Sequence, residues 1–516
     1  MNIVGEVTDG RPAGRREWVG LGVIALPCLL YSMDLTVLNL ALPALSADLR
    51  PSSTQLLWIV DIYGFMVAGL LIPMGTLGDR IGRRRLLMAG AAAFGVASML
   101  AAFASSAEML IAMRGLLGIA GATLAPSTLS LIRNMFHEPG QRTLAIGIWV
   151  SSYSIGAAVG PLVGGLLLEY FWWGSVFLLG VPVMMLLLLL GPVLLPEYRD
   201  PDAARPDLAS VALSLVAVLT VIYGFKRIAE AGWSVVAGLS LLAGALAGLA
   251  FLRRQRRLDD PLIDLRLFRA PTFSASLASY SLGCFALFGV YLFIGQYLQL
   301  VLGLSPLQAG IWTLPWALSF VVGSLITPLL LRRIGAATMV TAGLAIAAVG
   351  FVPLLQPFID LGLAVVLAAT VILSLGLAPV FTLATDLVVG AAPPERAGAA
   401  AAISETSSEF GGAMGIAILG SIGTAVYRAG FGGEAAAALS PDVIEASRAS
   451  LGGALAMAAQ LPSEAAATIT AVSRRSFTQG LQVMSLIAAC IMCATAVAFR
   501  AAMRSPAQGT PSLQNP

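Results

Sequence analysis

The sequence predicts an all-α membrane protein that crosses the bilayer many times, and its composition is the first reason. Of the 516 residues, 58% are hydrophobic and 11% are charged, and the mean hydropathy is +0.89. A soluble domain carries about 25% charged residues. The second reason is that the chain divides into about fourteen apolar runs, long enough as helices to cross a hydrocarbon core of about 30 Å. These runs cover residues 18–43, 55–77, 86–104, 108–131, 143–168, 174–195, 208–225, 233–252, 272–300, 306–331, 337–357, 361–389, 398–426 and 477–499.

The third observation is that most arginines fall in loops on one side of the membrane if every run spans it. Cytoplasmic loops carry the excess of Arg and Lys in membrane proteins. We therefore expect a multi-pass protein of the cytoplasmic (inner) membrane with both termini in the cytoplasm. The single lysine and the abundance of Ala, Gly and Arg indicate GC-rich coding and a bacterial source. The exceptions, on the outer face, are Lys226, Arg227, Arg428, Arg448, Arg474 and Arg475.

Several classes of function are disfavoured. The sequence has no G-x4-G-K-[ST] loop, which argues against ATP-driven pumping within this chain. His137 is the only histidine and has no catalytic partner set, so we do not expect an enzyme. The four cysteines lie in apolar runs and are expected to pack rather than to form disulfides or hold a metal. We expect no cofactor, no metal, no nucleic acid and a monomeric protein in contact with the lipid bilayer.

The first span contains a carboxylate, Asp34, well away from either end. An acid in hydrocarbon costs about 2.5–3.5 kcal/mol on insertion scales unless it finds water, a partner or a proton. Asp34 is therefore expected to face a wet cavity or to be protonated, and both indicate movement of ions or polar solutes. The alternative is a helix-packing aspartate with a local hydrogen bond.

The second span is followed by a tight turn, Gly75-Thr-Leu-Gly78-Asp79-Arg80-Ile-Gly82-Arg83-Arg84-Arg85. Its glycines allow two helix ends to approach closely, and Asp79 can meet a helix N-terminus or an arginine, while Arg80 and Arg83 reach across the interface. Such a cluster can hold the inner face shut; the alternative is a positive-inside anchor alone. Leu331-Arg332-Arg333-Ile-Gly335 is a shortened copy, which indicates two duplicated halves around a midplane site, as in secondary transporters.

An arginine, Arg114, lies a few residues inside the fourth span. At this depth an arginine requires a carboxylate or a wet cavity. Because Arg114 begins near the outer end, snorkelling to the headgroups is the alternative.

The fifth span contains a glycine–proline motif, Gly156-Ala-Ala-Val-Gly160-Pro161-Leu-Val-Gly164-Gly165. The glycine face permits close helix contact, and Pro161 frees a backbone carbonyl and bends the helix. Ordinary membrane packing explains any G-x-x-x-G, but the G-P-x-x-G-G extension is more specific.

Two further groups of acids lie within spans. In the second span, Asp61 lies between Trp58 and Tyr63, nearer the outer end. In the thirteenth, Glu405 and Glu409 are four residues apart and share a helix face. One of two such acids in a membrane is expected to hold a proton at neutral pH, which gives a proton-exchange site or, after the proton leaves, a cation site. The alternative is a paired structural dyad.

Aromatic residues in the spans can supply cation–π faces for a cationic ligand. Each one alone also fits packing or the aromatic belt at the membrane interface. The pocket candidates are Trp58, Tyr63, Trp149, Tyr153, Trp312, Trp316 and Phe320.

Asp34–Pro43, Gly75–Arg85, Arg114–Gly121 and Gly156–Gly165, in this order, resemble the major facilitator superfamily. The span count is similar to that of its fourteen-span drug:H+ antiporter family, and the closer resemblance is to multidrug exporters of the QacA, LfrA and SmvA type. It covers nearly the whole chain and includes Gln55–Tyr63, Leu124–Arg133 and Gln299–Gly310.

The resemblance implies two six-helix bundles with two extra helices between them. The corresponding division is a cytoplasmic N-terminus (1–17), an N-terminal bundle (18–195), the additional helices (208–252), a C-terminal bundle (272–499) and a cytoplasmic tail (500–516). Residues 429–476 form a long outer loop, either a structural cap or a functional element.

The resemblance further implies export of lipophilic cations, such as quaternary ammonium compounds, dyes and biguanides, in exchange for protons. Asp34 matches the family's first-helix acid, Arg114 matches the arginine linked to proton coupling, and Glu405 and Glu409 match two of the acids that line the thirteenth helix. Ser404 replaces a further glutamate of some members, and Phe320 replaces an aspartate of some divalent-cation exporters, which favours monovalent cations. Two alternatives are export of a specific metabolite or antibiotic, and a non-transporting membrane sensor or lipid-handling protein.

Overall fold

The computed structural model describes residues 12–51, 53–199, 207–258, 261–355, 362–393, 396–431, 443–444, 447–448 and 450–504. These residues form helices and connecting turns without a strand, and fourteen helical segments among them are long and apolar enough to cross a membrane. The predicted all-α polytopic class is confirmed. The helices are α1 (Arg15–Leu49), α2 (Ser53–Ile81), α3 (Arg83–Ala102), α4 (Ala107–Met135), α5 (Pro139–Tyr170), α6 (Ser175–Leu178), α7 (Gly180–Leu194), α8 (Leu208–Ala231), α9 (Val235–Gln255), α10 (Pro271–Gln296), α11 (Pro306–Ile334), α12 (Ala336–Phe351), α13 (Leu363–Ala391), α14 (Ala397–Ala429), α17 (Leu451–Ala458) and α18 (Ser463–Arg504), with short η1 (Leu267–Arg269), η2 (Tyr297–Val301) and η3 (Val352–Leu355).

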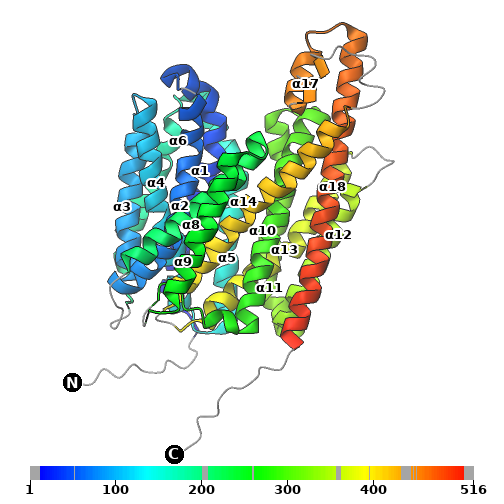
Figure 1. The fold of residues 1–516 in the computed structure, drawn as a ribbon. Coiled ribbons are helices and arrows are strands. Elements are labelled where there is room, and N and C mark those ends of the chain that lie inside the picture. Colours follow the sequence, from blue (N-terminus) through cyan, green and yellow to red (C-terminus); the bar gives the residue numbers. More distant parts are fainter. Residues whose placement is uncertain are drawn as a thin grey trace, which may run out of the picture.

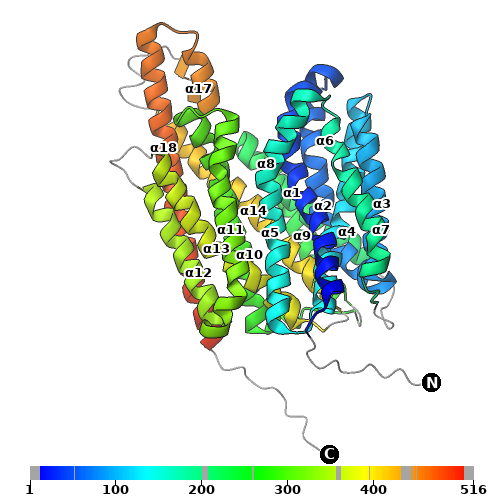
Figure 2. The same ribbon diagram turned by 180° about the vertical axis from the view of Figure 1, so that it is seen from behind.

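The helices form two halves, α1–α7 and α10–α18, which lean apart toward one end (Figure 1). The halves touch through α2 against α14 and α5 against α11; Figure 2 shows the second pair from behind. The additional helices α8 and α9 pack on each other as a hairpin, and α8 rests on α2 and α14. The hairpin therefore spans the contact between the halves.

Capping residues fix where several helices begin. Ser106, Ser234 and Ser305 each accept a hydrogen bond from a backbone N–H of the first turn of α4, α9 and α11. Glu138 does the same for α5, where Pro139 occupies the first helical position. Such caps satisfy N–H groups that have no partner within the helix, so the sequence places these boundaries locally.

Two single-residue joints connect helices at corresponding positions of the halves. Gly82 lies between α2 and α3 with φ of 110°, and Gly335 lies between α11 and α12 with φ of 77°. Both values fall where residues with a Cβ are strained, so the tight turns require glycine. The two joints occupy the two copies of the repeat predicted from the sequence.

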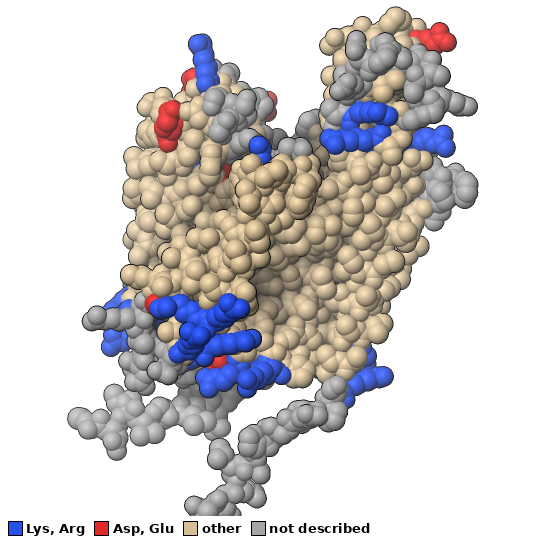
Figure 3. Space-filling view, in the orientation of Figure 1, with Lys and Arg blue, Asp and Glu red and all other residues tan. Residues whose placement is uncertain are grey.

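One end of the molecule carries most of the arginines, and we call it the arginine-rich end; α1 begins there and α18 ends there (Figure 1). In Figure 3 basic side chains gather at this end, whereas the surface between the two halves is hollowed at the opposite end. Arg84 at the start of α3, Arg253 at the end of α9 and Arg333 at the end of α11 belong to this end. The halves therefore meet at the arginine-rich end and separate at the other.

The last helix is longer than the sequence predicted. The last span, predicted as 477–499, belongs to α18, which has 42 residues and is about 63 Å long. This length exceeds a hydrocarbon core of about 30 Å, so α18 continues beyond the other helices, where α17 packs on it (Figure 1). Arg474 and Arg475 do not end the helix, because charged side chains are tolerated once a helix has left the lipid.

Candidate functional site

The N-terminal half holds a buried ion pair. Arg114 of α4 lies with Nη1 at 2.5 Å from Oδ2 of Asp34 on α1, and their side chains are 1% and 15% exposed. Arg114 also donates from Nε to the Ile59 carbonyl at 3.0 Å, and its guanidinium lies 4.9 Å from the centre of the Tyr63 ring. These contacts fix Arg114 inside the bundle rather than at the headgroups, and they neutralise Asp34.

A small cavity of about 20 Å³ opens beside Asp34, between α1, α3 and the α6–α7 pair. Its lining includes Asp34, Ser98 and Phe177. A cavity needs about 10–15 Å³ to hold one water molecule, so this space suits a water or a proton carrier but not a drug. The carboxylate is therefore reachable by a small polar species from within its own half.

The C-terminal half places its two acids on α14, one helical turn apart. Glu405 is 8% exposed and accepts a hydrogen bond from the Tyr280 hydroxyl at 3.4 Å. Glu409 accepts one from the Tyr31 hydroxyl at 2.6 Å. Both partners are neutral, and within the described part of the chain no arginine or lysine forms an ion pair with either glutamate.

The Tyr31–Glu409 hydrogen bond joins α1 of one half to α14 of the other. Glu409 is twelve residues from the start of α14, or about 18 Å into the helix, which is near the middle of a bilayer. Tyr31 is not among the residues predicted from the sequence. A signal was present, because Tyr31 lies three residues before Asp34 and residues at this spacing share one face of a helix. Tyr280 carried no comparable signal.

A chain of aromatic rings links the two sets of acids. Tyr63 lies 5.9 Å from Tyr31 between ring centres, Tyr31 lies 5.8 Å from Tyr153, and Tyr153 lies 5.0 Å from Trp149. Tyr63 is fully buried, and the Arg114 guanidinium lies 4.9 Å from the centre of its ring. Three predicted aromatic candidates, Tyr63, Tyr153 and Trp149, are therefore brought together in the N-terminal half around Tyr31, which bonds Glu409 of the other half.

Phe320 reaches the glutamates through two further rings. It lies 5.8 Å from Phe381, which lies 5.0 Å from Tyr280, the hydrogen-bond donor to Glu405. Phe320 is 4% exposed. The position therefore offers an apolar wall near the acids.

Four other predicted residues lie toward the end opposite the arginines. Trp58 and Asp61 are in the first turns of α2, where Trp58 is 43% exposed and Asp61 is partly buried. Trp312 and Trp316 line a small crevice at the start of α11, and Trp316 packs on Tyr291. The ring partners of Trp58 and Trp316 are Phe65 and Tyr291, and neither of these partners bonds Glu405 or Glu409 in the described part of the chain. The three tryptophans fit the aromatic belt at the membrane interface, and all four residues fit the entrance to the site.

The glycine–proline motif packs α5 against α1. Gly156 faces the backbone of Leu29, Gly164 faces Val37, and Gly160 is buried. A side chain at Gly156 would collide with the Leu29 carbonyl, so glycine sets the approach of α1, and with it the position of Tyr31. Gly165 faces open space, and the Pro161 side chain lies outside the described residues.

The turn after α2 forms the first contact between the halves at the arginine-rich end. Arg83 pairs with Asp79 at 2.5 Å, and Asp79 accepts a hydrogen bond from the Ala399 N–H at 3.2 Å. A carboxylate is favoured at a helix N-terminus, which here is the start of α14. Gly75 lies against α14 as well, whereas Arg80 is partly exposed. The motif therefore connects α2 of one half to the helix that carries both glutamates.

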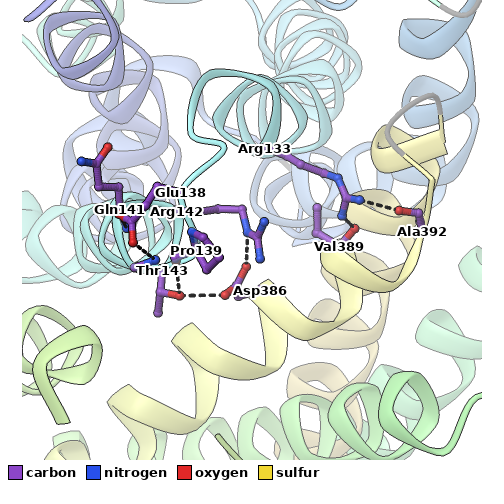
Figure 4. Close-up of polar contacts among 10 residues, drawn as sticks. Arg133, Glu138, Pro139, Gln141, Arg142, Thr143, Asp386, Val389 and Ala392 are labelled. Atoms are coloured by element: carbon purple, nitrogen blue, oxygen red, sulfur yellow. Dashed lines mark hydrogen bonds and ion pairs between the residues drawn. The ribbon is translucent and has the colours of Figure 1, made fainter. Parts of the chain in front are cut away.

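A second contact at this end was not predicted. Arg142 and Thr143 of α5 bind Asp386 of α13 at 2.7 and 2.8 Å, as Figure 4 shows. Arg133 of α4 donates to the carbonyls of Val389 and Ala392, the latter at 2.6 Å (Figure 4). The sequence signal for this contact is an acid near the end of the twelfth predicted span, Asp386.

Known proteins resemble most of the chain. Residues 24–416 match the family model described as Major Facilitator Superfamily. The multidrug efflux pump LfrA of Mycolicibacterium smegmatis is 45% identical over 489 residues, 95% of this chain and 97% of that protein. The methyl viologen resistance protein SmvA of Salmonella typhimurium is 36% identical over 463 residues, 90% of this chain and 93% of that one. The human organic anion transporter MFSD10 has a TM-score of 0.60 over 94% of this chain and 99% of that one, and at 16% identity it supports the fold alone.

Two halves of apolar helices long enough to cross a membrane, with buried acids in each half, are the architecture of secondary transporters. The chain belongs to the Major Facilitator Superfamily, and the relatives that match it over most of its length are drug efflux and resistance proteins. The predicted family is confirmed.

Proposed function

We propose that the protein is a proton-coupled antiporter that exports monovalent lipophilic cations, such as quaternary ammonium compounds, dyes and biguanides. The observation that carries this proposal is the pair Glu405 and Glu409, buried together with only hydroxyl partners described. Buried charges are costly unless paired, so this pair favours either protons or an external cation. The neighbouring rings of Tyr31, Tyr280 and Phe381 suit the apolar body and positive charge of such a ligand.

The proposed orientation puts the arginine-rich end in the cytoplasm, as the positive-inside rule requires. In that orientation the contacts of Asp79 and Asp386 close the cytoplasmic side, and the hollow of Figure 3 opens to the outside. The conformation then corresponds to the state in which a cation leaves and protons enter.

In the proposed cycle, protons from outside reach Glu405 and Glu409 and displace the cation. Protonated Glu409 accepts a weaker hydrogen bond from Tyr31, which loosens a connection between the halves. The halves then rock, the contacts of Asp79 and Asp386 open, and protons leave to the cytoplasm as a new cation binds. Exchange of two protons for one monovalent cation moves one net charge inward, worth about 2.3 kcal/mol per 100 mV.

The Asp34–Arg114 pair has a different role in this proposal. Because Arg114 already neutralises Asp34, this acid does not serve as the main counter-ion of a drug cation. Protonation of Asp34 through its small cavity would release Arg114, so the pair couples the N-terminal half to the proton gradient.

The preference for monovalent cations rests on Phe320. This side chain is buried against Phe381 and supplies no second negative region in the C-terminal half. The relative SmvA is named for methyl viologen, a dication, which makes this compound the natural counter-test. We expect this chain to export a monovalent dye such as ethidium better than methyl viologen.

Everted membrane vesicles test the function. Respiration acidifies their interior, and addition of ethidium or tetraphenylphosphonium should release protons only when the protein is present. Vesicles that contain the Glu405→Gln variant serve as the control for membrane effects of the dye. Uptake of the cations without proton release would contradict the coupling, and no response to any lipophilic cation would favour an exporter of one specific metabolite.

A further inference from the structure

The foot of the additional hairpin carries a dense group of exposed arginines. Six arginines and three aspartates occur between residues 253 and 269, a net charge of +3. In Figure 3 basic side chains gather below α8 and α9. The six arginines, which we call the hairpin foot, are Arg253, Arg254, Arg256, Arg257, Arg266 and Arg269, and all are exposed.

Two of the six are already neutralised. Arg254 binds Asp207 with Nε at 2.5 Å and Nη2 at 3.0 Å, and this guanidinium holds the pKa of the Asp207 carboxyl well below its usual range. Arg266 binds Asp264 at 3.0 Å. The other four have no carboxylate partner in the part of the chain that the structure describes; Asp259 and Asp260 lie outside it. Among the described residues, these four exposed guanidinium groups therefore lack a carboxylate partner.

The arginines continue an apolar face of α9. Leu242, Leu246 and Leu249 are 56%, 59% and 44% exposed, and Arg253 and Arg256 follow them at spacings of four and three residues. Residues at this spacing share one side of a helix. A stripe of exposed leucines that ends in arginines matches the acyl chains and the phosphate of one phospholipid.

The surface is held in a fixed shape. Leu262 and Ile263, in the loop after α9, are buried against α2, α10, α13 and α14. Gln255 accepts a hydrogen bond from the Ile263 N–H at 3.3 Å and donates one to Ser210 at 2.7 Å. The arginines are thus presented by a packed structure, and little ordering is required when a ligand binds.

We infer that the hairpin foot binds the headgroup of an anionic phospholipid in the leaflet at the arginine-rich end. Guanidinium groups bind phosphate oxygens in bidentate geometry, and clusters of four or more basic residues next to a membrane helix are typical of anionic-lipid sites. The leucine stripe favours a lipid over free phosphate or a soluble polyanion. This inference depends on no assignment of the transported substrate.

The loop that carries part of the hairpin foot also contacts the helix that holds both glutamates. Asp264 of the same loop also lies 3.6 Å from Arg396, the residue that precedes α14, and α14 carries Glu405 and Glu409. A bound headgroup that draws arginines of the hairpin foot toward the bilayer would act on the loop after α9, which contacts the start of α14 through the Asp264–Arg396 pair. Anionic lipid should therefore alter transport as well as bind.

Native mass spectrometry of the purified full-length protein tests the binding, with phosphatidylglycerol and phosphatidylcholine as probes. The test variant is Arg253→Gln/Arg256→Gln/Arg257→Gln/Arg269→Gln. The matched control is Arg332→Gln/Arg333→Gln/Arg500→Gln/Arg504→Gln. It removes four charges from the ends of α11 and α18, which belong to the C-terminal half at the same arginine-rich end. We expect the test variant to bind phosphatidylglycerol at least about tenfold more weakly, because each arginine contributes up to about 1 kcal/mol, and the control to bind it as the wild type does.

The outcomes are distinct. Equal losses in both variants would show that diffuse positive charge, and not the hairpin foot, attracts the lipid. Unchanged binding in the test variant, or displacement of phosphatidylglycerol by inorganic phosphate, would overturn the inference. If the fourfold variant does not fold, Arg253→Gln/Arg256→Gln gives the same test at the end of the leucine stripe, with thermal unfolding as the check on folding.

Discussion

The two halves of the molecule hold their buried acids in opposite electrostatic settings. In the N-terminal half, Asp34 is neutralised by Arg114 at 2.5 Å. In the C-terminal half, Glu405 and Glu409 have only tyrosine hydroxyls as described partners. The first arrangement is an internal salt bridge that a proton can open, and the second is a negative region that an external cation can neutralise.

The same contrast appears at the two glycine joints. Next to Gly82, Asp79 and Arg83 form a buried pair that reaches the start of α14. Next to Gly335, Arg332 and Arg333 are exposed and the turn contains no acid. The repeat thus preserves the backbone joint in both copies, whereas the charged contact between the halves is present in one. Duplicated geometry does not imply duplicated chemistry.

The largest expected effect is that of Glu405→Gln, which removes charge from the C-terminal half and keeps the shape. Attraction between unit charges about 4 Å apart is about 4 kcal/mol at an effective dielectric constant of 20, roughly a thousandfold in binding. We therefore expect ethidium transport in everted vesicles to fall by about a thousandfold. Glu169→Gln, an exposed position on α5, is the control. Transport near the wild-type rate would remove the C-terminal acids from the mechanism.

The salt bridge of the N-terminal half should behave differently when one partner is removed. Asp34→Asn leaves Arg114 charged and 1% exposed, and an unpaired buried charge costs about 3–5 kcal/mol. We expect a lower unfolding temperature in detergent for Asp34→Asn and recovery in Asp34→Asn/Arg114→Gln, while both variants lose substrate-dependent proton release. A double variant that is no more stable than the single one would show that the pair does not stabilise this half.

The hydrogen bonds to the glutamates allow a smaller test across the halves. Hydrogen bonds to charged groups contribute about 1.5–3 kcal/mol, so Tyr31→Phe should reduce transport by about tenfold. Tyr280→Phe should have less effect, because its hydroxyl lies 3.4 Å from Glu405 whereas that of Tyr31 lies 2.6 Å from Glu409. Vesicle transport rates compare the two. The reverse order would place the important hydroxyl within the C-terminal half.

The glycine joints give the smallest expected difference. Asp79→Asn weakens one charged contact, worth about 1 kcal/mol, and should shift the population toward opening at the arginine-rich end by about fivefold. Arg333→Gln, in the other copy, should shift nothing, because Arg333 is exposed. Distances between spin labels on the two halves at this end measure both populations. Equal shifts would mean that net charge, rather than the Asp79 contact, holds this end together.

The fold followed largely from local patterns. These patterns are apolar runs of span length, Ser and Pro at helix starts, and glycine at the two joints. Each acts over a short stretch of chain, so it can be recognised without knowledge of the tertiary packing. The bounds that differ most lie where a helix leaves the lipid, as in α18, which continues through Arg474 and Arg475. Hydropathy marks where lipid ends, not where hydrogen bonding along a helix ends.

The sequence by itself determined that acids and an arginine would lie inside the membrane, since no rearrangement can remove Asp34, Arg114, Glu405 and Glu409 from their apolar runs. Only the tertiary structure decided which residues pair: Arg114 with Asp34, Tyr31 with Glu409 and, at the arginine-rich end, Asp386 with Arg142. These partners are separated by 80, 378 and 244 residues along the chain. Pairings over such distances depend on how the helices of the two halves pack and not on any pattern within a single span.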